Sequence, residues 1–308
     1  MTKEQYLKNL NPPIQKVDVV LDTDAYNEVD DQFAIAYLLK ASERVSLKGI
    51  CAAPFLNDRS ISPADGMEKS HQEILKLLTL AGHEDLKANV YRGSEHFLKN
   101  EDEPVASPAV DYIASIADKY TPEQPLYIIA IGAITNVASA ILKNPAVKEN
   151  CVVIWLGGHG THIAQPAYEF NMRQDIAAAR VVFGCGIPMV QLPCGGVVDH
   201  LSATKYELAH WLKDKNPLAH YLYCQTVEEA EKTSPYPAWS RIFWDISAVA
   251  WVLQNDASAF LRDRLIPAPI PEHDGTYSLD PDRHLIRYVN WISRDAIFSD
   301  LFGRLGSK

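Results

Sequence analysis

Four aspartates stand close together near the start of the chain: Asp22, Asp24, Asp30 and Asp31. Gathered carboxylates repel one another unless a cation or shared protons neutralise them. Oxygen-rich clusters of this kind suit Ca²⁺ or Mg²⁺, whereas zinc prefers histidine and cysteine ligands. Helix capping by Asp30 or Asp31 would explain one or two of these acids, but not all four. The spacing therefore predicts a site for a divalent metal ion.

The elements around these acids would bring them together. Residues 17–21 form a short, β-branched and largely apolar run, which predicts a buried parallel strand over these residues, followed directly by Asp22. A helix with a broad apolar face is predicted to begin at Asp30 and to run to Leu39. The four carboxylates would then meet where the carboxyl end of the strand faces the start of the helix.

Further apolar strands alternate with helical segments along the chain. The next predicted strands cover residues 45–53, 126–131, 151–156 and 187–192. This alternation predicts an α/β fold with an open, mostly parallel sheet flanked by helices, a Rossmann-like core and a small C-terminal hairpin over residues 277–289. No break in the sequence demands two domains, so we expect one domain over residues 1–308.

Composition narrows the class of partner. The formal net charge is −10 and no basic run occurs, which argues against a nucleic-acid partner and favours a small molecule. No apolar run approaches the length of a membrane span, and the first residues lack the apolar core of a signal peptide. The five cysteines form no CxxC pair, which favours buried, reduced thiols. We therefore expect a cytoplasmic protein without a membrane partner.

Polar residues at later strand ends are candidates for the same site. Asn57 follows the second strand, where a polar turn is an equally good explanation, and a single acid, Asp245, opens an apolar helix. The loop over residues 234–239 is rich in proline, tyrosine and tryptophan. Its Trp239 would suit a wall for a planar base, and a packed surface hairpin of aromatic residues explains the loop as well.

Four stretches resemble the inosine-uridine-preferring nucleoside hydrolase family. Residues 22–31 are similar to its DxDPGxDD signature, although the turn is two residues longer and lacks the Pro-Gly pair. Residues 132–136 resemble its TGPLTN turn, with Ile131 in place of the threonine. Residues 169–171, Glu-Phe-Asn, followed by an acid that opens a helix, match its AEFN and DPEAA block. Asp245 matches the aspartate of its HDP motif.

The resemblance implies a fold, a metal and a set of site residues. It implies a nucleoside hydrolase-like fold and a calcium-dependent enzyme that cleaves the N-glycosidic bond of a small-molecule ribonucleoside, acting in purine or pyrimidine salvage as a homodimer or homotetramer. The implied metal ligands are Asp24, Asp31, Asp245 and the main-chain oxygen of Ile131. Asp24 would be the catalytic base, and the implied substrate-binding residues are Asp30, Asn57, Glu169, Asn171 and Asp245, with Asn27 as a competitor for the role of Asn57.

The group that assists departure of the base differs from the one in the family. The family places a histidine beside the base, and this chain has Trp244 at that position. Either His159 or His162 would protonate the base, or an aromatic ring stacked on it, Trp244 or Trp239, would raise its basicity.

Two other functions remain open from the sequence. A nucleoside-binding or ribose-binding protein could keep the metal site and lack turnover, and Trp244 favours that alternative. A phosphohydrolase of the strand-end DxD type would form a phosphoenzyme on Asp22, but it would leave Glu169, Asn171 and Asp245 without a purpose. The motifs therefore favour hydrolysis of a ribonucleoside.

Overall fold

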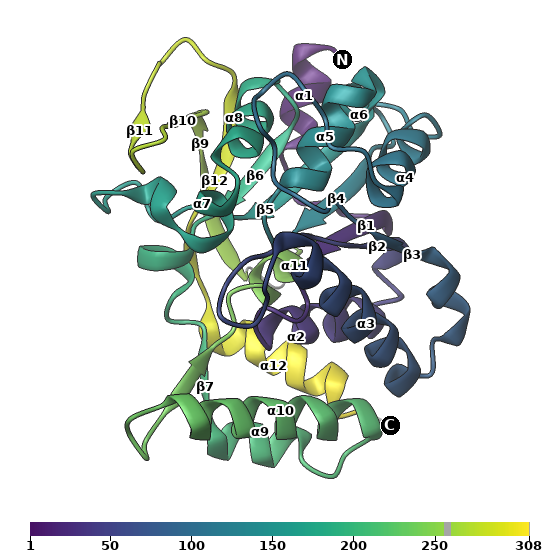
Figure 1. The fold of residues 1–308 in the computed structure, drawn as a ribbon, viewed down its shortest axis with the longest axis vertical. Coiled ribbons are helices and arrows are strands. Elements are labelled where there is room, and N and C mark those ends of the chain that lie inside the picture. Colours follow the sequence, from purple (N-terminus) through teal and green to yellow (C-terminus); the bar gives the residue numbers. More distant parts are fainter. Residues whose placement is uncertain (256–259, 308) are drawn as a thin grey trace.

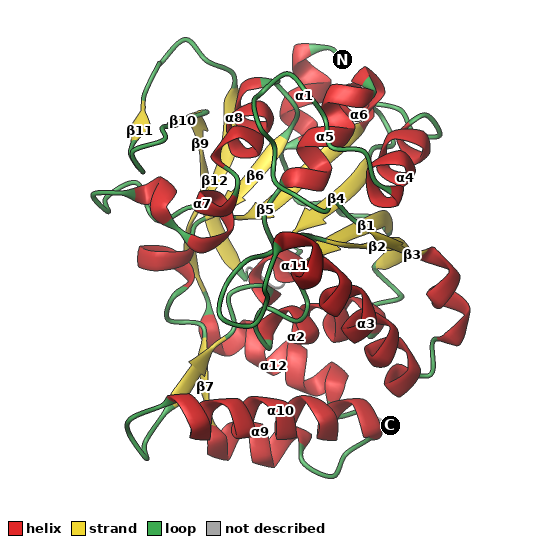
Figure 2. Cartoon of the chain, in the orientation of Figure 1, coloured by secondary structure: helices red, strands yellow, loops and turns green. Residues whose placement is uncertain are grey.

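A computed structural model describes residues 1–255 and 260–307. Within these residues the central sheet has eight strands in the order β3-β2-β1-β4-β5-β6-β12-β9 (Figures 1 and 2). Its strands are β1 (Val17–Thr23), β2 (Val45–Ala52), β3 (Val90–Arg92), β4 (Leu126–Ala130), β5 (Cys151–Leu156), β6 (Met189–Leu192), β9 (Leu261–Pro267) and β12 (Leu285–Ile292). Neighbouring strands are parallel except for the antiparallel pair β12 and β9. The predicted open, mostly parallel α/β sheet is therefore confirmed.

Helices cover both faces of the sheet. One face carries α4 (Pro108–Ala117), α5 (Thr135–Lys143), α6 (Pro145–Asn150) and α8 (Ile176–Gly184). The other carries α2 (Asp30–Leu39), α3 (Pro63–Ala81), α11 (Ile246–Leu253) and α12 (Arg294–Leu305), with α9 (Lys205–Leu212) and α10 (Pro217–Thr233) outside them. None of the helices in the described part of the chain is long and apolar enough to span a membrane.

Short elements complete the described fold. They are α1 (Lys3–Asn9), α7 (Phe170–Gln174), η1 (Glu84–Asn89), η2 (Pro166–Tyr168), η3 (Cys194–Val198) and two small sheets, β7 (Ser202–Thr204) with β8 (Ser240–Ile242) and β10 (Ile270–Pro271) with β11 (Tyr277–Ser278). The loops that join β5 to α7 and β6 to β7 lie at the carboxyl ends of their strands.

Local sequence explains why these elements form. Val19 and Leu21 of β1 enter one apolar cluster while Val20 enters the other, because successive side chains of a strand point to opposite faces. In α3 the side chain of Ser62 accepts a hydrogen bond from the Asp65 N–H, Pro63 occupies the first turn, and Gly82 ends the helix with φ 75°.

The C-terminal hairpin has a different pairing from the expected one. Tyr277 and Ser278 form β11, which pairs with β10, whereas β12 joins the central sheet between β6 and β9. Residues 277–289 therefore do not form one hairpin; the antiparallel pair is β9 with β12. The strand β12 has buried residues that include Ile286, Tyr288 and Val289, so burial inside a sheet is more favourable for it than an exposed hairpin.

The strand order explains where a ligand site can lie. From β1 the chain moves outward to β2 and β3, and then returns to β4 on the other side of β1. Loops that leave β1 and β4 at their carboxyl ends run in opposite directions, which opens a crevice between them. Asp24 follows β1 and Ile131 follows β4, so both stand at this crevice.

Candidate functional site

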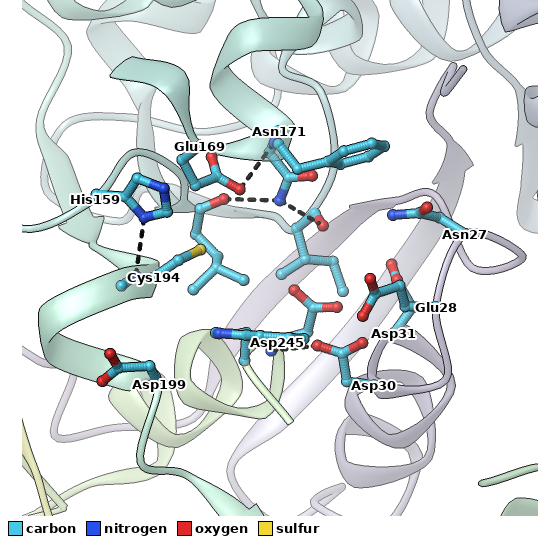
Figure 3. A pocket seen from close by; sticks show the side chains of 15 residues that line it. Asn27, Glu28, Asp30, Asp31, His159, Glu169, Asn171, Cys194, Asp199 and Asp245 are labelled. Atoms are coloured by element: carbon cyan, nitrogen blue, oxygen red, sulfur yellow. Dashed lines mark hydrogen bonds between the residues drawn. The ribbon is translucent and has the colours of Figure 1, made fainter. Parts of the chain in front are cut away.

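A pocket lies beyond the carboxyl ends of β1, β4, β5 and β6 (Figure 3). It encloses about 680 Å³, including its open mouth, which is within the range of small-molecule sites. Most of the residues that the sequence singled out line it: Asn27, Asp30, Asp31, Ile131, His159, Glu169, Asn171, Trp244 and Asp245. Segments far apart in the sequence therefore form one site.

Four predicted residues do not line the pocket. Asp24 is buried beside the acids of the pocket, and Asn57 lies one layer back, where its Nδ2 donates to Asn27 Oδ1 at 2.6 Å. His162 is exposed and its ring lies against Gly196. Trp239 packs against the apolar cluster that contains α2 and α11.

Other residues line the pocket although the sequence analysis did not select them. They are Glu28, Leu156, Phe170, Cys194, Gly195 and Asp199. Cys194 and Gly195 follow β6, so the rule that strand ends carry ligand groups would have found them. Glu28 stands in the lengthened turn after β1, whereas no signal in the sequence marks Asp199.

The acids of the pocket form a tight cluster. Asp30, Asp31 and Asp245 each offer an oxygen within 4.8 Å of the others, and all three side chains are buried. Asp30 and Asp31 begin α2, and Asp245 precedes α11, so two adjoining helices bring their starts together. Asp245 also donates its backbone N–H to Asp30 Oδ2 at 3.3 Å.

Asp24 lies next to this group of carboxylates, close enough to Asp30 and Asp31 for their charges to repel. Neither of its buried oxygens has a hydrogen-bond partner among the described residues. Gly132 lies directly against it, because a Cβ at this position would come within 3.0 Å of Asp24 Oδ1 and 3.2 Å of the Ala53 side chain. A glycine after β4 therefore allows the carboxylate of the β1 loop to approach the β4 loop closely.

Burial and mutual repulsion change the proton affinity of these acids. Burial raises the pKa of Asp24, Asp31 and Asp245 well above the usual range, and the neighbouring carboxylates raise it further. Burial also raises the pKa of Asp30, although Arg241 opposes this shift. In β1, burial raises the pKa of Asp22 to about 7, although a hydrogen bond from Asn136 opposes this shift.

A main-chain carbonyl faces the same pocket. The Ile131 oxygen accepts a hydrogen bond from Asn171 Nδ2 at 3.2 Å, and the same nitrogen donates to the Leu156 carbonyl at 3.1 Å. These two bonds fix the side-chain amide of Asn171, so that its Oδ1 is the atom free to accept from a ligand.

Glu169 is held as a hydrogen-bond acceptor. Its Oε2 accepts from the Gly158 and Met172 N–H groups at 2.9 and 3.0 Å, and its Oε1 accepts from the Asn171 N–H at 2.8 Å. Burial raises the pKa of Glu169, and these three N–H donors oppose the rise. Nearby, burial and the Glu169 carboxylate raise the pKa of the Cys194 thiol, so this cysteine stays protonated.

The residues of the cluster fit a hard divalent cation. The donors available are carboxylate and carbonyl oxygens, as calcium and magnesium prefer. The two unpartnered oxygens of buried Asp24 would otherwise remain without a hydrogen bond or a counter-charge. A bound cation would give these oxygens a partner and would balance their negative charge.

Comparisons with known proteins agree on one family. The family model described as inosine-uridine preferring nucleoside hydrolase matches residues 19–280. The pyrimidine-specific ribonucleoside hydrolase RihB of Escherichia coli is 26% identical over 58% of this chain, and the match spans 60% of RihB. The pyrimidine-specific ribonucleoside hydrolase RihA of Photobacterium profundum is 26% identical over 71% of this chain and 79% of its own.

Solved structures share the fold. A plant nucleoside hydrolase superposes with a TM-score of 0.74 at 20% identity, covering 95% of this chain and 99% of its own. A purine-preferring ribonucleoside hydrolase from Gardnerella vaginalis gives a TM-score of 0.73 at 22% identity, covering 94% and 98%. At these identities the likeness concerns the fold.

Proposed function

Because the chain belongs to the inosine-uridine preferring nucleoside hydrolase family, we propose that it hydrolyses the N-glycosidic bond of ribonucleosides to give ribose and the free base. The observation that carries the proposal is the buried cluster of Asp30, Asp31 and Asp245 beside the unpartnered oxygens of Asp24. The three clustered acids line a pocket that is also lined by the aromatic ring of Trp244 and by fixed polar side chains. This combination suits a sugar joined to a planar base.

Calcium is the proposed metal, held by Asp24, Asp31, Asp245 and the Ile131 carbonyl. When bound, such an ion lowers the pKa of water and binds a sugar diol. Asp24 is the proposed base, because its free oxygens can take a proton from the water that attacks C1′. Asp30 accepts from a ribose hydroxyl, and Glu169 and Asn171 hold the far side of the sugar.

Departure of the base depends on the side of the pocket that carries Trp244. We propose that the indole stacks on the base and stabilises it as the C1′–N bond breaks. His159 also lines the pocket, whereas His162 and Trp239 lie outside its lining. Asn27 faces the substrate from the lengthened turn and is braced by Asn57.

The same family likeness supports further proposals about the protein's setting. We expect a homodimer or homotetramer, which light scattering after size exclusion would measure. All five cysteines are free, and Cys51, Cys151 and Cys194 are buried, which agrees with a reducing, cytoplasmic location. We propose a role in purine or pyrimidine salvage.

A panel assay tests the function against its rivals. The pure protein is incubated with nucleosides and nucleotides, with calcium or with a chelator, and ribose, base and phosphate are measured. Release of ribose and base that the chelator abolishes supports the proposal. Binding without products would identify a binding protein that keeps the metal site. Release of phosphate would point to a phosphohydrolase acting through Asp22, which accepts from Asn136 and lies outside the pocket lining.

Two variants make the assay specific to the site. Asp245→Asn removes one charge from the cluster, and we expect it to abolish measurable release of base. Asp18→Asn makes the same chemical change at the opposite end of β1, where Asp18 pairs with Lys48 at 3.1 Å. The control variant should keep the wild-type rate; equal losses in both variants would contradict the proposed site.

A further inference from the structure

Two acids stand at the mouth of the pocket, outside the buried cluster. Glu28 lies in the turn between β1 and α2 and Asp199 follows η3, and Figure 3 shows them on opposite sides of the pocket. The Glu28 side chain is 38% exposed and Asp199 is exposed, whereas Asp30, Asp31 and Asp245 are buried. In the proposed function the sugar contacts the buried cluster, so the base points towards these two acids.

The contacts of both acids favour the ionised form. Arg241 Nη2 donates to Glu28 Oε2 at 2.9 Å, and the Gly196 N–H donates to Asp199 Oδ2 at 2.9 Å. A hydrogen bond to a carboxylate oxygen, and above all one from a guanidinium, stabilises the charged state. Asp199 has no ion pair within the described part of the chain. Its negative charge is therefore not balanced by the protein.

The pocket has no fixed positive charge of its own. Among the described residues that line it there is no lysine or arginine. Arg241 lies outside the lining and is shared between Glu28 and Glu229, at 2.9 and 3.0 Å. Arg173 also lies outside, over the Phe170 ring at 5.4 Å from its centroid. The carboxylates of the lining thus give the mouth a negative potential.

An aromatic ring stands in the same part of the pocket. Trp244 lines it and is partly exposed. The face of an indole attracts cations more strongly than other aromatic side chains do. A flat heterocycle with a positive charge would gain both this attraction and that of the two carboxylates. A neutral base would gain the stacking alone.

A positive charge on the base also removes the need for an acid. The Gly195 N–H donates to His159 Nδ1 at 3.0 Å, and this contact opposes an imidazolium that could protonate a base. With a cationic base, the oxygen of water bonds to C1′ while the electron pair of the C1′–N bond passes to the ring nitrogen and neutralises it. The proton of the water goes to Asp24, and the products are ribose and a neutral base.

We propose that this pocket takes ribosides whose base carries a fixed positive charge, of which an N-ribosylpyridinium is the simplest. The inference rests on the proposed function and adds the class of base to it. Glu28, Asp199 and Trp244 select the charge, and the bond then breaks without a proton donor. Neutral nucleosides are the poorer substrates of the site.

Two small molecules of one shape test the charge preference without turnover. 1-Methylnicotinamide is a pyridinium cation, and 3-methylbenzamide has the same outline without the charge. Calorimetry with calcium and ribose present, so that the sugar part of the pocket is filled, should show about tenfold tighter binding of the cation. Added salt should reduce that advantage, because it screens the exposed charges at the mouth. Equal affinities for the two molecules would overturn the inference.

Variants assign the preference to the named residues. Asp199→Asn and Glu28→Gln keep the shape and remove the charge, so each should weaken binding of the cation by about three- to tenfold and leave the neutral molecule unchanged. Trp244→Ala should also weaken the cation more. The matched controls are Asp18→Asn and Glu84→Gln, because both acids are ion-paired outside the pocket lining. Equal losses for both molecules in the pocket variants would contradict a role in charge selection.

Kinetics then separate this inference from the proposed function. For nicotinamide riboside, kcat/KM should exceed that for inosine and uridine, and Asp199→Asn should reduce it by a larger factor than it does for uridine. The comparison of factors cancels the intrinsic reactivity of each substrate. Hydrolysis of uridine or inosine without preferred binding of the cation would refute the inference and leave the hydrolase proposal standing. Selective binding of the cation without hydrolysis of any riboside would refute the hydrolase and leave the cation site standing.

Discussion

Asp24 differs from the other acids of the pocket in its surroundings. Asp30 accepts from the Asp245 N–H and Asp31 accepts from the Thr23 hydroxyl, whereas both Asp24 oxygens lack a partner among the described residues. A buried carboxylate without hydrogen bonds is costly. Its lone pairs are thus available to a cation and to a proton from water, which is why we assign it the role of base.

Replacing Asp24 tests that role at the level of one atom. Asp24→Asn keeps the shape of the side chain but cannot take a proton, so we expect kcat to fall by about 10²- to 10⁴-fold. Steady-state kinetics at saturating calcium would measure the change, with Asp18→Asn as the control. A variant that kept more than about a tenth of the wild-type kcat would show that another group removes the proton.

Trp244 offers a second test at the residue scale. It precedes Asp245 at the start of α11, and its carbonyl accepts from the Ser247 hydroxyl at 2.6 Å, so the Trp244 backbone is tied to the first turn of that helix. We expect Trp244→Ala to lower kcat for nucleosides by about 10- to 100-fold, and Trp244→Phe to lose less, because stacking on the base is worth about 1–3 kcal/mol.

The substrate dependence separates stacking from a packing defect. Hydrolysis of p-nitrophenyl ribofuranoside, whose leaving group needs no activation, should be nearly unchanged in Trp244→Ala. If the variant is folded and loses no more than a few-fold on every nucleoside, the stacking role is wrong.

At the scale of elements, the lengthened turn between β1 and α2 is held by its neighbours. The Tyr26 N–H donates to Ser70 Oγ of α3 at 3.2 Å, Asn57 donates to Asn27, and Arg241 of β8 pairs with Glu28 at 2.9 Å. Burial raises the pKa of Glu28 to about 7, with a further contribution from Asp30, and Arg241 opposes it. The turn is thus a fixed wall of the pocket although it lacks the Pro-Gly pair.

A double-mutant cycle measures how the turn is braced. Asn57→Ala frees the Asn27 side chain, so we expect kcat/KM to fall by about three- to tenfold. Asn27→Ala should cost at least as much, and the double variant should cost little more than Asn27→Ala alone, because the residues act through one contact. Fully additive losses would show that Asn57 acts independently of Asn27.

At the scale of the molecule, one continuous sheet separates two apolar clusters. We propose that the whole chain is one folding unit, since the strands β9 and β12 from the C-terminal part complete the sheet begun by β1. Differential scanning calorimetry should then show one cooperative transition with equal calorimetric and van't Hoff enthalpies. Two separated transitions would contradict a single unit.

The buried acids make stability depend on metal and pH. In the chelator-treated protein the folded state keeps protons on Asp24, Asp31 and Asp245 that the unfolded chain releases above about pH 4. The folded state then binds more protons, so the free energy of unfolding falls as the pH rises; for Asp22 this window ends near pH 7.

Urea unfolding at pH 5 and pH 8, with calcium and with a chelator, would measure this effect. Between pH 5 and pH 8, the free energy of unfolding of the chelated protein should fall by about 1.4 kcal/mol for each pH unit over which one carboxyl group is protonated only in the folded state. Calcium at 100 times its Kd should restore about 2.7 kcal/mol. Stability that did not fall with pH in the chelated protein would show that these carboxylates are ionised and solvated.

Local patterns in the sequence were sufficient for many elements. The helix Asp30–Leu39 and the strand Cys151–Leu156 have the predicted bounds, because acids in the first turn of a helix and a short apolar run act within a few residues. The strand before the first acids runs two residues further than predicted, to Thr23, since pairing with β2 continues past Asp22. The alternation of apolar strands and helical segments also predicted the open, mostly parallel sheet.

The sequence by itself determined the strands, the helices and the acids at strand ends, because these depend on near neighbours along the chain. Only the tertiary structure decided that His159 lines the pocket while His162 is exposed, that Cys194 and Glu28 join it, and that β12 pairs with β6 and β9. Those outcomes depend on which remote segments the order of the sheet brings together, and side chains three residues apart in a loop can face opposite ways.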